Sequence, residues 1–238
     1  LLAMKTGSNA RDPDAIGALY AEGLVLARAL ESDDQLVAAV RRYREMAATF
    51  EGLLDTSSAR DAAARLEKNP ELRQQQKSLK KWNAFERNYL GEMNSYFFEL
   101  RNAEIAPAPA HLMRGFRINE LQRRALEPGI EGVTARRALN ALSTGLNFYV
   151  ARDLIAAGQY DRLAVCLEVG LQVREDSAAG WYNLACARAQ LGREEAAMEA
   201  LGQALDLGFE RSELLATDPD LDPLRVRDDF KELLVGHE

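Results

Sequence analysis

Few side chains in this sequence have the type and spacing that catalysis or metal binding requires. The two histidines, His111 and His237, lie far apart and have no further metal ligands at suitable spacing. The two cysteines, Cys166 and Cys186, are too few for a disulfide framework or a zinc site, and we expect both to be small packed side chains. No nucleophile elbow, phosphate loop, dinucleotide fingerprint or zinc-protease motif occurs. We therefore predict no catalytic residue, no metal site and no cofactor.

Charged side chains are distributed unevenly along the chain. The net charge is −7 and the pI about 5.1, which argues against attraction to nucleic acid or to anionic lipid. Residues 73–137 are locally basic, and the chain is acidic from residue 194 onward. The acidic group at 218–222 lacks the glycine and the distant glutamate of a calcium loop. We expect solvated helix surface in both regions; the alternative is steering of a partner or of another part of the chain.

The first half of the chain has helical periodicity. Residues 1–11 lack it and are predicted to be a lead-in linker. An N-terminal helical region is predicted over 12–105, with a helical hairpin over 15–50, a short helix over 57–67 and an unusually long helix over 70–102. The long helix would extend about 45 Å at about 1.5 Å per residue. Its apolar stripe is expected to be core: Leu72, Leu79, Trp82, Phe85, Tyr89, Met93, Tyr96, Phe97 and Leu100.

Prolines and glycines divide the second half. Pro107 and Pro109 interrupt the helical pattern, and connecting helices are predicted over 110–143, one of them over 111–126. A further long helix is predicted from about residue 133 to residue 157. No apolar run is long enough for a membrane span.

A 34-residue spacing relates two segments near the C-terminus. Gly158 and Gly192 lie 34 residues apart, which is the tetratricopeptide period. The second segment contains Trp181, Leu184, Ala185, Gly192, Ala197, Leu201 and Ala204. The same positions one period earlier are Asn147, Val150, Ala151, Gly158, Leu163, Leu167 and Gly170. In these residues the chain resembles the tetratricopeptide repeat (TPR) family, and in particular bacterial TPR-like proteins with a C-terminal capping helix.

The resemblance implies an all-α fold, a right-handed α-solenoid of helical hairpins. It implies a TPR repeat over 178–211, a TPR-like repeat over 144–177, a capping helix over 212–236 and a possible degenerate repeat over 15–50. The sequence departs from the family pattern at four positions. Asn147 replaces an aromatic residue, Leu163 a small residue, Arg188 a tyrosine and Phe209 a proline.

The resemblance also implies a partner-binding groove, because the first helix of each repeat lines a concave surface in this family. The groove positions in this chain are Phe148, Arg152, Ile155, Tyr182, Cys186 and Ala189. An apolar or aromatic partner suits Phe148 and Tyr182. The alternative is that the chain's own long helix covers this surface.

We interpret the chain as a non-catalytic scaffold that binds a protein, a peptide or an upstream domain of the same polypeptide. The alternative is a helical C-terminal accessory domain of a larger bacterial enzyme, a hydrolase or a redox protein, whose catalytic domain precedes this chain. The sequence begins at Leu1 and not at methionine, so we expect an upstream segment to have been removed. The sequence is compatible both with a cytoplasmic protein and with one exported after removal of a leader.

Overall fold

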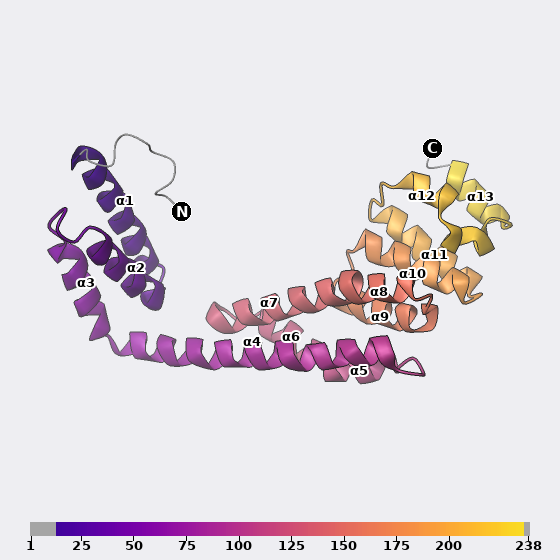
Figure 1. Ribbon diagram of the computed structural model, residues 1–238, viewed down its shortest axis with the longest axis horizontal. Coiled ribbons are helices and arrows are strands. Elements are labelled where there is room, and N and C mark those ends of the chain that lie inside the picture. Colours follow the sequence, from indigo (N-terminus) through magenta and orange to yellow (C-terminus); the bar gives the residue numbers. More distant parts are fainter. Residues whose placement is uncertain (1–12, 236–238) are drawn as a thin grey trace. The chain divides into compact units, whose positions relative to one another are not determined.

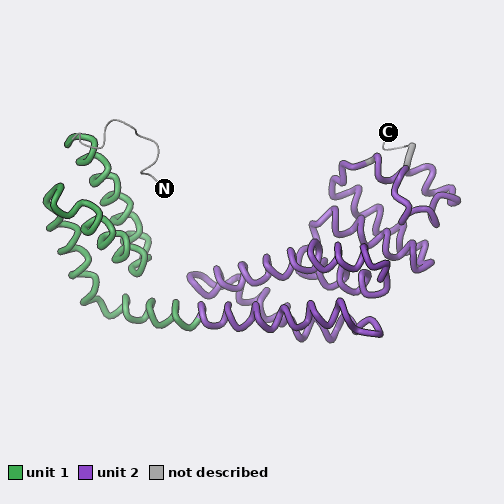
Figure 2. The backbone as a smooth tube through the Cα atoms, viewed as in Figure 1, with its two compact units in different colours: residues 1–81 green, residues 82–238 purple. Residues whose placement is uncertain are grey.

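The computed structural model describes residues 13–235, and every regular element in this range is a helix (Figure 1). The predicted all-α class is confirmed for these residues; the predicted linker at 1–11 lies outside them. The chain divides into two compact units, residues 1–81 and 82–238, with the boundary inside one long helix (Figure 2). Each unit has an apolar core of its own. Between residues 13 and 235, no helix combines the length and the hydropathy needed to cross a membrane.

The first unit consists of α1 (Pro13–Ser32), α2 (Leu36–Thr49), α3 (Ser57–Glu67) and the start of α4 (Pro70–Asn102). α1 and α2 form the hairpin predicted over 15–50. They approach closely at Gly23, where a Cβ would overlap the sulfur of Met46. All four helices contribute to the core of this unit: Tyr20, Leu24, Tyr43, Met46, Ala63, Leu66 and Leu72.

α4 covers the residues predicted for the long helix. In the second unit its apolar stripe is covered, with Trp82 4%, Tyr89 1% and Phe97 7% exposed. The rings of Tyr96 and Phe97 lie 5.2 Å and 5.8 Å from the ring of Phe116. The neighbouring helices are α5 (Pro109–Gly115), α6 (Ile118–Ala125) and α7 (Gly129–Thr144), alongside the second half of α4 (Figure 1).

The prediction of a single helix over 111–126 is wrong, because α5 and α6 are separate helices. Between them Arg117 has a left-handed backbone with φ of 52°. Its guanidinium lies 5.2 Å from the Phe85 ring centre and donates a 2.7 Å hydrogen bond to Glu92. Gly115 lets the chain pass against the Tyr96 ring, which a Cβ would overlap. Contacts with α4, distant in sequence, therefore set this break.

The helix predicted from residue 133 to 157 begins earlier, at Gly129, and includes a π-helical segment. α7 continues through η2 (Gly145–Val150) into α8 (Ala151–Ala156). The Ala151 amide donates to the carbonyl of Leu146, five residues back, as a π-helix requires. The repeat boundary predicted at residue 144 therefore falls inside a continuous helix. The next helices are α9 (Tyr160–Val173), α10 (Ala178–Gln190) and α11 (Glu194–Asp206).

The turns of three hairpins have the same geometry. The turn residues Asp34, Gly158 and Gly192 have φ values of 57°, 64° and 67°. After each, the next amide donates to a carbonyl five residues back, at 2.8 Å to Leu30, 2.9 Å to Leu154 and 2.9 Å to Arg188. Glycine adopts this left-handed conformation without penalty, and aspartate is among the few other residues that tolerate it.

The C-terminal segment is three short helices rather than the single capping helix predicted over 212–236. They are α12 (Ser212–Thr217), the 3₁₀ helix η3 (Pro219–Leu224) and α13 (Asp228–Val235); residue 236 lies outside the described range. Pro219 begins a new helix after Asp218, whose carboxylate accepts the amide of Asp220 at 2.9 Å. Leu221, Leu224 and Phe230 are fully buried in the core of the second unit.

Candidate partner-binding surface

The six residues predicted to line a groove fall into two groups that differ in exposure. Phe148 is 59% and Ile155 36% exposed, and Arg152 is exposed beside them. In the second group, Tyr182 is 4%, Cys186 5% and Ala189 1% exposed. The structure therefore leaves the first group accessible and covers the second.

Tyr182 is covered by residues that follow α11. Its ring stacks on Phe209 at 4.2 Å between ring centres, and its hydroxyl donates to Asp218 at 2.8 Å. Burial raises the pKa of this tyrosine. The prediction of an open groove at Tyr182, Cys186 and Ala189 is thus corrected. The covering element is also not the long helix considered from the sequence but the segment from Phe209 into η3.

Further hydrogen bonds hold this segment on α9 and α10. The hydroxyl of Tyr160 donates to Asp220 at 2.6 Å, and this bond raises the pKa of Tyr160 to about 12. Gln190 donates to the carbonyl of Asp220 at 3.1 Å. Asp218 and Asp220 therefore bind two tyrosines of the same chain.

Cys166, Cys186 and His111 have surroundings typical of residues with a structural role. Cys166 is fully buried, and its thiol donates to the carbonyl of Leu146 in η2 at 3.2 Å. Burial raises the pKa of both Cys166 and Cys186, which keeps the thiols protonated and poorly nucleophilic. His111 lies half-exposed beside Glu99, with 3.4 Å between Nε2 and Oε1. His237 is outside the described residues.

The accessible group lies on η2 and α8 and gains a residue that the sequence analysis missed. Tyr149 is 51% exposed and meets Phe148 edge to face, with 5.1 Å between ring centres. The family register, applied to a regular α-helix, selected only Phe148. In the wider π-helical turn both neighbouring aromatics reach solvent, and the adjacent pair in the sequence was the available signal. We define the exposed surface as Phe148, Tyr149, Arg152 and Ile155.

Ion pairs fix the helix that carries this exposed surface. Asp153 accepts hydrogen bonds from Arg101 of α4 at 2.8 Å and from Arg152 at 3.1 Å. The hydrogen bond from Arg101 is the main reason that the pKa of Asp153 is lowered. Arg152 itself stays 65% exposed. The surface therefore combines two aromatic rings and a largely exposed guanidinium on a braced helix, a composition typical of protein interfaces.

Comparison with known proteins gives one partial match. Over 60 residues the chain is 38% identical to a protein of Arabidopsis thaliana whose name describes it as chloroplastic. The match covers 25% of this chain and 18% of that protein, so the chain spans less than a fifth of this relative. No family model matches the chain, and no solved structure matches it.

Proposed function

We propose that this chain is a non-catalytic protein-interaction scaffold of the tetratricopeptide type. In this proposal residues 144–177 and 178–211 are repeats that stack as a right-handed solenoid, and residues 15–50 are a degenerate repeat. The exposed surface on η2 and α8 binds a protein or peptide, or an upstream domain of the same polypeptide. The observation that carries the proposal is this surface, in which Phe148, Arg152 and Ile155 lie at positions where the family binds its partners.

The 34-residue spacing of the turns at Gly158 and Gly192 supports the repeat assignment, and so does the packing at one pair of positions. The pair lies eleven residues before and twelve after each turn residue: Gly23 with Met46, Asn147 with Gly170, and Trp181 with Ala204. One member of each pair is small. A Cβ at Gly23 would overlap Met46, and a Cβ at Gly170 would overlap Asn147. The glycine lies in the first helix of the one hairpin and in the second helix of the other, so the close approach is kept in these two hairpins while the residues differ.

Truncation of the aromatic pair tests the proposed binding surface. The double variant Phe148→Ala with Tyr149→Ala should reduce partner capture from the native host at least tenfold, because interface aromatics contribute about 2 kcal/mol or more each. Its melting temperature should stay close to that of the unaltered chain, since both rings are at least half exposed. The measurement is quantitative mass spectrometry of proteins co-purified with the intact chain.

The matched control is Leu126→Ala with Val226→Ala, at positions that are 86% and 78% exposed and outside the surface. It should retain full capture. Equal capture by all three chains would contradict the proposal, and so would a large drop in the melting temperature of the aromatic variant, which would identify the rings as core.

A further inference from the structure

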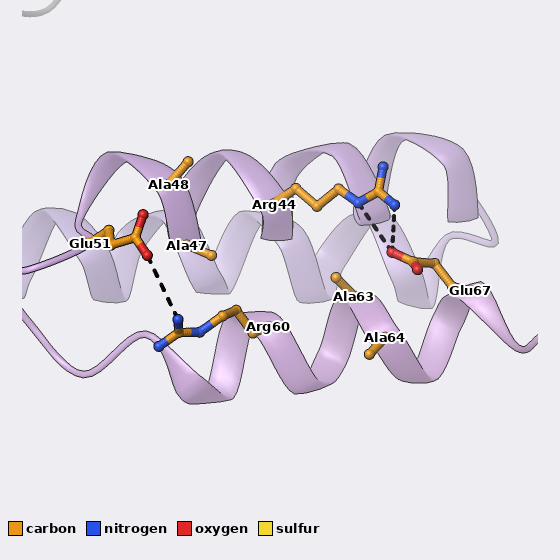
Figure 3. Close-up of a pocket in the computed structure, with 8 residues that line it drawn as sticks. All are labelled: Arg44, Ala47, Ala48, Glu51, Arg60, Ala63, Ala64 and Glu67. Carbon is orange, nitrogen blue, oxygen red and sulfur yellow. Dashed lines mark hydrogen bonds and ion pairs between the residues drawn. The ribbon is translucent and has the colours of Figure 1, made fainter.

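The helices α2 and α3 present the same side chains in the same order to a groove between them (Figure 3). The pattern is an arginine, two adjacent alanines and a glutamate at identical spacing; its glutamate is the last residue of α3 in one set and lies in the turn that follows α2 in the other. The groove encloses about 320 Å³. Its lining residues are Arg44, Ala47, Ala48 and Glu51 from one side and Arg60, Ala63, Ala64 and Glu67 from the other.

Ion pairs cross the groove at both ends. Arg44 lies 2.8 Å from Glu67 at one end, and Arg60 lies 3.9 Å from Glu51 at the other (Figure 3). The helices are therefore antiparallel, and an approximate local two-fold axis through the groove relates the two sets of side chains. All four charged side chains remain between 41% and 74% exposed. Exposed ion pairs of this kind add little to the stability of a fold.

The order of the charges makes the groove complementary to itself. The four charged side chains lie at the corners of a rectangle. Going around it, their signs alternate in the order Arg44, Glu51, Arg60 and Glu67. A second copy can be placed with its groove against this groove, related to the first copy by a two-fold axis that runs parallel or perpendicular to the helices. Every corner then meets a corner of opposite charge; Arg44, for example, faces Glu67 or Glu51 of the second copy. Between the corners, Ala48 and Ala64 are exposed and small enough to let helices approach closely.

We propose that this groove is a self-association site at which two copies of the chain pack α2 and α3 against each other. A symmetric dimer needs a surface that complements itself, and this arrangement of charges does so in the two orientations described. A foreign helix would need a charge pattern of its own to match these rows. Nucleic acid and other polyanions would be repelled by two of the four corners. The site belongs to the first unit and is independent of the surface on η2 and α8.

Two variants of the full chain, each with groove charges of one sign only, test the proposal. One variant, Arg44→Glu with Arg60→Glu, makes all four corners acidic; the other, Glu51→Arg with Glu67→Arg, makes them all basic. Sedimentation equilibrium should show a monomer–dimer equilibrium for the unaltered chain. Each variant alone should raise the dissociation constant at least tenfold, because like charges then face each other. An equimolar mixture of the two variants should regain association, since acidic corners now meet basic ones.

The control is Arg28→Glu with Lys77→Glu, which changes the net charge as much as the acidic variant does, at exposed positions outside the groove. It should associate like the unaltered chain. Circular dichroism establishes that each variant is folded. The proposal is overturned if the unaltered chain stays monomeric at millimolar concentration, if both variants associate on their own, or if folded variants fail to associate when mixed.

Discussion

At the scale of single residues, the approach of two helices depends on the size of one side chain. Gly170 faces Asn147, whose side-chain oxygen is buried without a hydrogen-bond partner among the described residues. The variant Gly170→Ala should lower the free energy of unfolding by about 1–3 kcal/mol, as overpacking does. Adding Asn147→Ala should restore most of this loss by removing the overlap. Urea unfolding followed by circular dichroism measures both effects.

The matched control for Gly170→Ala is Gly202→Ala in α11, where a Cβ would meet no atom within 4 Å. This change should leave stability equal or raise it by up to about 1 kcal/mol, because alanine favours helix more than glycine does. If Asn147→Ala gives no rescue, the overlap is not the cause of the loss.

At the scale of elements, the C-terminal helices complete the core of the second unit. Phe230 of α13 is fully buried, whereas Val226, four residues earlier, is 78% exposed. Phe230→Ala should lower the free energy of unfolding by about 3–5 kcal/mol, the usual cost of removing a buried ring. Val226→Ala should change it by less than about 0.5 kcal/mol. Thermal and urea unfolding of the two variants measure these changes. Similar losses of stability in Phe230→Ala and Val226→Ala would contradict a capping role for the C-terminal helices.

At the scale of the whole molecule, the two units have separate cores that share one helix. Leu66 is 3% exposed and belongs to the core of the first unit. Leu66→Ala should destabilise that unit by about 2–5 kcal/mol. We expect hydrogen–deuterium exchange to become faster in α1, α2 and α3 and to stay unchanged in α10 and α11. Faster exchange throughout the chain would show instead that the units unfold as one.

Local patterns predicted much of the helical layout. The prolines and the apolar stripe predicted the long helix over 70–102, and the 34-residue spacing of Gly158 and Gly192 predicted two turns of the same kind. Both depend on short-range physics, namely helical periodicity and the left-handed backbone that glycine adopts at no cost. The break at Arg117 escaped prediction, because it depends on Glu92, Phe85 and Tyr96 of another helix.

The sequence by itself determined most of the helical segments and which helix faces are apolar, because both follow from residues within a few positions of one another. Only the tertiary structure decided which of those faces are exposed to solvent. Tyr182 and Phe148 lie 34 residues apart in the sequence. Phe209 and Asp218 cover Tyr182, whereas nothing described in the structure covers Phe148 to the same extent. That difference is made by a segment far along the chain, and burial depends on such long-range packing rather than on local periodicity.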